Sequence, residues 1–344
     1  DYLGTDGGLI LIKSGNYIIS KRINIKGSVT IVGENAHTTR LYLADNANDH
    51  MFVYDEEYDT YFITFKHLSL WGNKANQTEA RNAIHLSEYA KDVLLFDVYI
   101  QDFKGHGLYH AAAWNTRVIG CTFEDLDGYG IYTNGNYDLR VINSKFLYIY
   151  SGAIYTSAAH SIIAFNYFRE NKIRAIRIKQ VNTEPTDIII HGNVFYNNAK
   201  IASNQYEDIF IQAGKRIIIT NNSFDGRNIA KYAINISSGV SDVIIERNTF
   251  INYVTSPINN LGSNVKIKNN IGYLTENSGT ATIPAGSTRV TVEHGLVSAP
   301  TKVLVTPKAN IGAVWVENIT DTSFDIVCET APASDVEVMW YAEV

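Results

Sequence analysis

Apolar and polar residues alternate over short segments of this chain, and turn-forming residues separate the segments. Residues 17–32 (YIISKRINIKGSVTIV) show the alternation, interrupted by a glycine. A two-residue period is typical of a β-strand with one buried face, because successive strand side chains point to opposite sides. Residues 82–275 show no convincing apolar spacing near 3.6 residues, which an amphipathic helix requires. The pattern therefore predicts a chain built of short β-strands.

One unit of this pattern is repeated, most clearly in residues 105–127 and 128–150. These segments read GHGLYHAAAWNTRVIGCTFEDLD and GYGIYTNGNYDLRVINSKFLYIY, and they align without a gap. A repeat of this length indicates a solenoid, in which each coil buries its apolar face by stacking on the next. A large apolar residue closes one strand of each coil: Ile100, Phe123, Phe146, Phe168, Phe195, Phe224, Phe250 and Ile271.

Asparagines recur two positions before these closing residues. The column comprises Asn166, Asn193, Asn222, Asn248 and Asn269. Stacked asparagines form ladders whose side-chain amides hydrogen-bond from coil to coil, so we assign this column a structural role. Leucine-rich repeats would require recurrent leucines, which the chain lacks. Short β-branched strands punctuated by Gly and Asn favour a parallel β-helix.

The coils ending in Asn193-Val194-Phe195-Tyr196 and Asn248-Thr249-Phe250 resemble the right-handed β-helix of pectate-lyase-like proteins. That group includes pectate and alginate lyases, uronan epimerases and phage tailspikes. The resemblance implies an all-β chain whose residues 1–275 form a single-stranded, right-handed parallel β-helix. It does not specify the reaction, because the same fold hosts lyases, hydrolases, epimerases and inert binders.

The pattern changes near residue 276. Glu276-Asn277-Ser278-Gly279 is expected to be a linker, and longer strand candidates follow at about 288–294, 302–306, 313–328 and 335–343. Residues 276–344 are thus predicted to form a small antiparallel β-sandwich, which resembles the H-type lectin sandwich with its central turn at 318–324. That family is trimeric and binds sugars, so the resemblance implies a homotrimer. A core of this size is marginal alone, which also favours association.

Composition narrows the classes of partner. The formal net charge is −6 without blocks of like charge, which argues against nucleic acid as a partner. No apolar run reaches membrane-spanning length, so membrane insertion is not expected. Cys121 and Cys328 lie in different sequence environments, and a disulfide between them is not expected. The chain has 22 tyrosines, which suit both strands and sugar-binding surfaces.

Strand phase predicts two columns of outward-facing side chains. The first comprises His85, Tyr109, Tyr132, Tyr155, Arg177, Phe210 and Asn235. The second, two residues further along each strand, comprises Ser87, Ala111, Asn134, Ser157, Lys179, Gln212 and Ser237. Coils stack about 4.8 Å apart, so such columns match a few sugar units of a polysaccharide. Two interpretations stay open: a glycan-binding or catalytic groove, and aromatic stacking that only stabilises the sheet.

β-Elimination on a uronate polymer suits the cationic end of the first column. Arg177 is predicted to neutralise the substrate carboxylate, because a guanidinium pairs with it bidentately. Tyr132 or Tyr155 is predicted as base or acid, since the neighbouring cation would favour the phenolate, and Lys179 is a further catalytic candidate. His110 falls on an inward position and is expected to be a packed histidine. The predicted substrate-binding residues are His85, Tyr109, Asn134, Arg174 and Gln212.

Two rival functions remain open. Hydrolysis needs two carboxylates across the scissile bond, and the outward columns contain none. Acidic residues instead cluster in predicted turns: Asp102, Glu124, Asp125, Asp127 and Glu170. A non-catalytic fibre or adhesin would use the tyrosines only for binding. Calcium needs several converging oxygens, and Asp125 with Asp127 are too sparse, so no cofactor is expected.

The sequence thus predicts an extracellular or virion-associated (tail or fibre) homotrimer that degrades an acidic polysaccharide. A lyase is favoured, and a tailspike-type glycoside hydrolase or a glycan-binding adhesin is the alternative.

Overall fold

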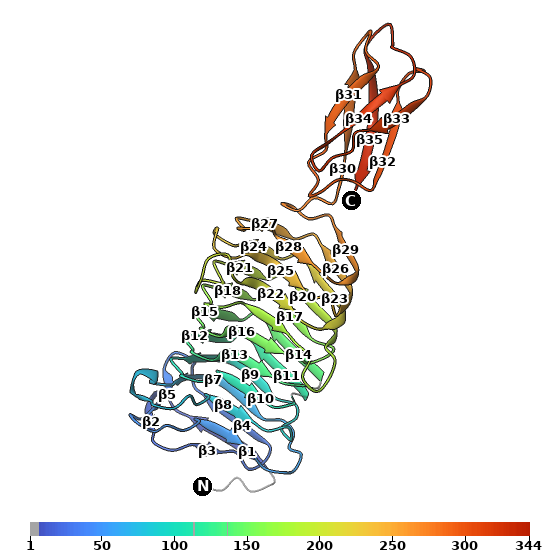
Figure 1. The fold of residues 1–344 in the computed structure, drawn as a ribbon. Coiled ribbons are helices and arrows are strands. Elements are labelled where there is room, and N and C mark those ends of the chain that lie inside the picture. Colours follow the sequence, from blue (N-terminus) through green and yellow to red (C-terminus); the bar gives the residue numbers. More distant parts are fainter. Residues whose placement is uncertain (1–6, 113, 136) are drawn as a thin grey trace. The chain divides into compact units, whose positions relative to one another are not determined.

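The computed structural model describes residues 7–112, 114–135 and 137–344. Residues 1–6 of the predicted β-helix domain, Ala113 and Asn136 lie outside the described residues. The chain divides into two compact units, one up to Lys266 and the other Ile267–Val344 (Figure 1). Regular structure in the described ranges is β-strand apart from one 3-10 turn, η1 (Lys74–Asn76), so the predicted all-β class is confirmed. No helix of the described residues is long and apolar enough to span a membrane.

The first unit is a solenoid of parallel strands, visible in Figure 1 as coils stacked from blue to yellow. One of its sheets consists of short strands that pair in chain order. They are β3 (Ile23–Asn24), β6 (Phe52–Tyr54), β8 (Ile84–Leu86), β10 (Leu108–His110), β13 (Tyr129–Thr133), β16 (Gly152–Thr156), β19 (Ile176–Ile178), β22 (Glu207–Ile211), β25 (Tyr232–Ile236) and β28 (Ile258–Asn260). The first predicted outward column belongs to this sheet, whereas each residue of the second directly follows the end of a strand. In the second column the outward prediction is wrong for Ser157, which is fully buried.

The remaining strands of the solenoid form a second, larger sheet, in which each later coil contributes a strand pair separated by a tight turn. They are β1 (Gly8–Ile12), β2 (Gly15–Ile19), β4 (Val29–Gly33), β5 (Thr39–Leu43), β7 (Thr64–Trp71), β9 (Leu94–Gln101), β11 (Trp114–Ile119), β12 (Thr122–Glu124), β14 (Tyr137–Ile142), β15 (Lys145–Leu147), β17 (Ile162–Ala164), β18 (Tyr167–Arg169), β20 (Thr186–His191), β21 (Val194–Tyr196), β23 (Gly214–Thr220), β24 (Ser223–Asp225), β26 (Val240–Glu246), β27 (Thr249–Ile251) and β29 (Ser263–Lys268).

Stacked phenylalanines fill the interior between the two sheets. The ring centroids of Phe123 and Phe146 are 5.0 Å apart, and those of Phe195 and Phe224 are 4.5 Å apart. The stack ends at Phe250, which is 2% exposed. Burying each such ring contributes about 2–3 kcal/mol, so the repeated Phe is a main source of coil-to-coil stability.

The asparagine ladder forms as predicted except in its last coil. Asn166, Asn193 and Asn222 each donate a side-chain N–H to the side-chain oxygen of the next ladder residue at 3.0 Å. In every coil a residue with positive φ precedes the ladder residue, and in the last coil that residue is Asn269. The buried ladder residue is therefore Asn270.

The assignment of Ile271 as the last closing residue is also wrong, because its side chain is 67% exposed. The final turn is shifted by one residue, and a shift of one moves each side chain to the other face of a strand.

The second unit contains two antiparallel sheets of three strands each within the described residues. One has the order β30 (Glu276–Ile283), β35 (Val336–Glu343) and β32 (Lys302–Pro307), and the other β31 (Arg289–Glu293), β34 (Ser323–Cys328) and β33 (Val314–Glu317). Glu276–Gly279 is thus strand, not linker, because it pairs with β35 along its whole length.

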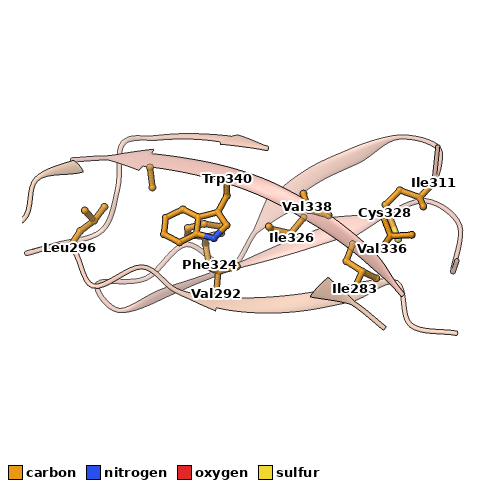
Figure 2. Close-up of a cluster of buried hydrophobic side chains, with 11 residues drawn as sticks. Ile283, Val292, Leu296, Ile311, Phe324, Ile326, Cys328, Val336, Val338 and Trp340 are labelled. Atoms are coloured by element: carbon orange, nitrogen blue, oxygen red, sulfur yellow. The ribbon is translucent and has the colours of Figure 1, made fainter. Parts of the chain in front are cut away.

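Side chains from both sheets form the core of this sandwich. Phe324, Ile326, Val338 and Trp340 are buried together, as Figure 2 shows. The ring centroids of Phe324 and Trp340 lie 5.6 Å apart in an edge-to-face arrangement. The predicted small antiparallel β-sandwich is therefore confirmed.

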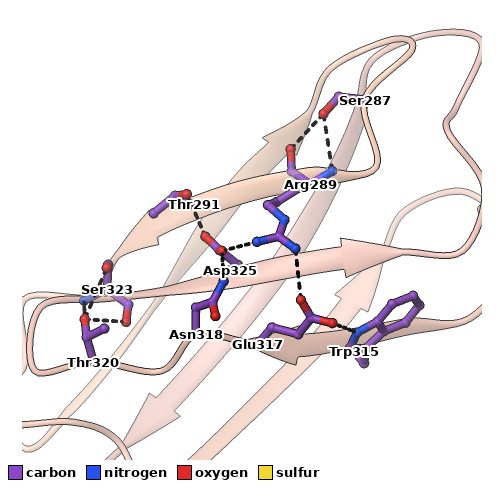
Figure 3. Close-up of polar contacts among 9 residues, drawn as sticks. All are labelled: Ser287, Arg289, Thr291, Trp315, Glu317, Asn318, Thr320, Ser323 and Asp325. Carbon is purple, nitrogen blue, oxygen red and sulfur yellow. Dashed lines mark hydrogen bonds and ion pairs between the residues drawn. The ribbon is translucent and has the colours of Figure 1, made fainter.

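A polar network covers the outer face of the β31–β34–β33 sheet (Figure 3). The Arg289 guanidinium contacts Asp325 at 2.8 Å and Glu317 at 2.9 Å. Thr291 and Asn318 also donate hydrogen bonds to Asp325, at 2.6 and 2.8 Å. These donors hold the pKa of Asp325 below its ordinary value, and the network links all three strands.

Candidate functional site

The strand register aligns the first predicted outward column across seven coils. The paired positions are His85, Tyr109, Tyr132, Tyr155, Arg177, Phe210 and Asn235. The predicted register of this column is therefore confirmed.

The first four residues of the column form a continuous stack, which we call the aromatic ladder (His85, Tyr109, Tyr132 and Tyr155). Consecutive ring centroids lie 4.6, 5.5 and 4.5 Å apart, with interplanar angles of 11°, 8° and 8°. Because the rings lie flat against one another, their faces are covered. A sugar ring can therefore contact only the edges and hydroxyl groups of the ladder.

The pKa values of the two candidate catalytic tyrosines are opposite to the expected direction. Burial raises the pKa of Tyr132, and burial raises the pKa of Tyr155 although the neighbouring Arg177 charge opposes it. Arg177 does favour the phenolate of Tyr155, but the expected net lowering of the pKa is wrong because desolvation outweighs the cation. Both phenols are therefore protonated at neutral pH.

Arg177 follows the ladder as a cation without an ion pair within 4.0 Å among the described residues, and Glu207 interacts with it only at longer range. Its guanidinium carbon lies 5.6 Å from the centre of the Tyr155 ring, and one Nη donates to the Gln212 side-chain oxygen at 2.8 Å. Its Nε is buried without a hydrogen-bond partner, and no carboxylate of the described residues lies within 4.0 Å of the guanidinium. Lys179, half-buried two positions along the chain, likewise has no ion-pair partner in the described ranges. This end of the ladder therefore carries excess positive charge.

Arg174, by contrast, is neutralised inside the protein. Its Nε contacts Glu207 at 3.0 Å, and the two residues are 9% and 4% exposed. The Arg174 guanidinium also lies over the Phe210 ring, 5.3 Å from its centre. Burial raises the pKa of Glu207, an effect that the Arg174 charge opposes. A substrate could bind Arg174 only in competition with Glu207.

Sequence reasoning missed Glu207 because strict alternation placed it inside the coil. It belongs to a third set of residues, two positions before each inward residue, that reach the same outer surface. His106 and Tyr129 belong to this set: their rings lie 5.0 Å from Tyr132 and 5.5 Å from Tyr155. The sequence did contain a signal for this third set. In the other coils a small residue directly follows each member of the set: Ala83, Gly107, Gly130, Ala153, Ala175 and Ala233.

Asp208 replaces the small residue in one coil and is fully buried. Its carboxyl accepts hydrogen bonds from Asn198 Nδ2 at 2.8 Å and from the Tyr253 hydroxyl. Burial raises the pKa of Asp208 to about 7. An acid that titrates near neutrality therefore lies behind the cationic end of the ladder.

Two histidines on the outer surface, His106 and His85, accept a hydrogen bond at Nδ1 and carry their proton on Nε2. The Tyr129 backbone N–H donates to His106 Nδ1 at 2.8 Å, and Asn82 Nδ2 lies 3.0 Å from His85 Nδ1. With Nδ1 accepting, the proton of each neutral ring is on Nε2. Burial lowers the pKa of His106 to about 4, so it stays neutral.

The remaining predicted residues have structural partners. Asn134 accepts the Ala112 backbone N–H at 3.0 Å. His110 is fully buried and hydrogen-bonds to Thr116 and to the Ala90 carbonyl, both at 2.9 Å. The expectation of a packed histidine is confirmed for His110.

Most of the turn acids considered for hydrolysis are occupied. Lys74 Nζ lies 2.8 Å from Asp125 and 3.1 Å from Asp127, which places a cation between these carboxylates. Glu170 pairs with Arg169 and Lys200, and Glu124 accepts the Tyr99 hydroxyl, as separate contacts. The described residues contain no group of three or more His, Cys, Asp or Glu that could hold a metal ion.

Comparison with known proteins supports the fold. Residues 50–200 match the family described as a right-handed β-helix region. The structure is similar to ORF18 of Geobacillus virus E2, with 14% identity over 94% of this chain and 68% of that chain and a TM-score of 0.54.

Two further similarities are weaker. The A-module of the Azotobacter vinelandii mannuronan C-5 epimerase AlgE4 is 14% identical over 76% of this chain and 91% of that chain, with a TM-score of 0.44. The tailspike protein gp49 from Pseudomonas phage LKA1 is 12% identical over 98% of this chain and 91% of that chain, with a TM-score of 0.34. A search of curated proteins found no match. The chain is thus a right-handed parallel β-helix followed by a small antiparallel β-sandwich, as the sequence predicted.

Proposed function

We propose that this protein binds an acidic polysaccharide across the aromatic ladder and cleaves it by β-elimination. The observation that carries the proposal is the Arg177 guanidinium, which has a buried, unpartnered Nε and no carboxylate within 4.0 Å among the described residues. A partly desolvated cation with free donors favours an anionic ligand, and a uronate carboxylate matches the geometry of guanidinium.

Each step of the reaction has a candidate group beside Arg177. Arg177 neutralises the uronate carboxylate, which acidifies the proton at C5. Lys179 is the candidate base, and its side-chain nitrogen accepts that proton. A C4–C5 double bond then forms while the bond from C4 to O4 breaks. The protonated Tyr155, stacked on Tyr132, donates the proton that O4 needs to leave.

The test is a screen of the protein against polygalacturonate, alginate and hyaluronan with two readouts. Elimination produces unsaturated uronate ends, which absorb in the ultraviolet, together with new reducing ends. Arg177→Ala should lower kcat/KM about 100-fold, because it removes the main stabiliser of the developing charge. Arg177→Lys should retain part of the rate, since it keeps the charge but not the bidentate geometry.

Arg169→Ala is the matched control, because Arg169 pairs with Glu170 on the other sheet. Unchanged elimination in Arg177→Ala would refute the site. Reducing ends without ultraviolet absorbance would indicate hydrolysis, and binding without either product would indicate an adhesin.

Assembly and location belong to the same proposal. The sandwich is proposed to form a homotrimer, and light scattering that shows a monomer would refute this. An extracellular or virion-associated location is proposed because an intact polysaccharide substrate lies outside the cell.

A further inference from the structure

A groove lies on the outer face of the larger sheet, in the first coils of the solenoid. Its volume is about 700 Å³, and its lining includes Ile18, Tyr42, Asp45, Trp71, Asn73 and Asp102. None of these residues belongs to the aromatic ladder or to the cationic end beyond it. We call this feature the Trp71 groove.

One side of the Trp71 groove is an apolar ledge. Ile18 pairs in register with Tyr42, and Tyr42 pairs in register with Trp71, so the three side chains project from neighbouring strands. The Tyr42 and Trp71 ring centroids are 5.3 Å apart, and the rings are tilted by 35°. Both residues are half-buried, and because of the tilt each ring covers only part of the other's face. The Tyr99 ring also lies near Trp71, at 6.2 Å and an angle of 53°.

The other side of the groove carries polar turn residues. Asp45 Oδ1 accepts hydrogen bonds from Asn73 Nδ2 at 2.8 Å and from Asn76 Nδ2 at 3.1 Å, which fix the orientation of the carboxylate. Asp102 adopts a positive φ of 60° in its turn. The nearby ammonium of Lys74 contacts Asp125 and Asp127. It makes no ion pair with Asp102 within 4.0 Å among the described residues, but its charge opposes the rise in the Asp102 pKa that burial causes.

We propose that the Trp71 groove binds the neutral hexose units of a glycan. A pyranose ring has an apolar C–H face that packs on aromatic side chains, and a rim of hydroxyls that donate to carboxylates. The Tyr42–Trp71 ledge offers the first contact, and Asp45 with Asp102 offer the second. Two carboxylates repel an anionic sugar, so this groove favours neutral sugars, whereas the Arg177 end favours acidic ones. The groove acts as a binding site separate from the proposed cleavage site.

The test is affinity electrophoresis of the whole chain in gels that contain dextran, curdlan, hydroxyethyl cellulose or galactomannan. At least one of these neutral polysaccharides should retard the wild-type protein. Trp71→Ala should weaken that retardation at least tenfold, as expected for loss of an aromatic sugar contact. Trp114→Ala is the matched control, because Trp114 is 47% exposed on the same sheet but lies outside the groove.

Asp102→Ala is a second variant that leaves the aromatic ledge intact, and it should weaken retardation about tenfold through loss of a charge-assisted hydrogen bond. The proposal is overturned if no neutral polysaccharide retards the wild type, or if both groove variants migrate like it. Arg177→Ala should leave neutral binding unchanged, so failure here and failure of the elimination proposal are distinguishable.

Discussion

The aromatic ladder and the Trp71 groove both place rings on neighbouring coils of one β-helix, yet they present different surfaces. In the ladder, Tyr132 and Tyr155 lie 4.5 Å apart with an angle of 8° between their planes. In the groove, Tyr42 and Trp71 lie 5.3 Å apart with an angle of 35°. The first arrangement covers the ring faces, and the second leaves them partly open. Register alone therefore does not make an aromatic column a sugar-binding platform, because ring tilt decides which part of the ring is presented.

The two surfaces also differ in charge. The ladder ends at Arg177, which lacks a carboxylate within 4.0 Å in the described ranges, whereas Asp45 and Asp102 line the groove. Burial raises the pKa of one acid at each place. Asp208, behind the cationic end, is fully buried, and Asp102, in the groove, is half-buried. Predictions that separate the two surfaces follow from these differences.

The largest expected effect concerns Asp208. Its folded pKa of about 7 lies above its ordinary value of 3.8, so the folded state holds a proton that the unfolded state loses. Stability therefore falls as pH rises from about 4 to about 7, by up to about 4 kcal/mol. Asp208→Asn keeps an acceptor for Asn198 and removes the charge, so it should be more stable than wild type at pH 8 and similar at pH 4. Urea unfolding across this range measures the difference.

The control for this prediction is Asp138→Asn, because Asp138 is half-buried in β14 and has no ion pair within 4.0 Å among the described residues. Parallel stability profiles for wild type and Asp208→Asn would contradict the assignment of the buried acid.

A smaller effect on the free energy of unfolding separates the stacked rings of the ladder from the tilted rings of the groove. Tyr132→Ala removes a ring stacked on both sides, so the free energy of unfolding should fall by about 3 kcal/mol. Tyr42→Ala removes a half-buried ring from an open ledge and should cost about 1 kcal/mol. Urea midpoints compare the two, and equal losses would mean that the ladder is no better packed than the ledge.

The smallest effect is the response of binding to salt. Raising ionic strength from 0.1 M to 1 M shortens the Debye length from about 10 Å to about 3 Å. Binding of an acidic polysaccharide should weaken about tenfold, because Arg177 attracts it by charge. Retardation by a neutral polysaccharide should change less than about twofold, since its contacts are packing and short hydrogen bonds. Equal salt dependence in the two assays would remove the distinction in charge between the surfaces.

Several features followed from local sequence pattern. The repeated Phe and Asn positions predicted the buried stack and the ladder, and strand alternation predicted the register from His85 to Asn235. The wrong assignments occur where the pattern is interrupted. One extra residue in the last turn moved the ladder from Asn269 to Asn270, and Glu276–Gly279, which looks like a linker, becomes a strand by pairing with β35.

The amino-acid order determined the period, the coil interior and the face to which each mid-strand residue points, because these depend on contacts repeated at a fixed spacing. Only the tertiary structure decided the partners at the coil corners and the protonation of buried groups. Glu207 pairs with Arg174 from the preceding coil, and burial outweighs the Arg177 charge on Tyr155. Desolvation and ion pairing depend on side chains from several coils at once, and no single repeat contains that information.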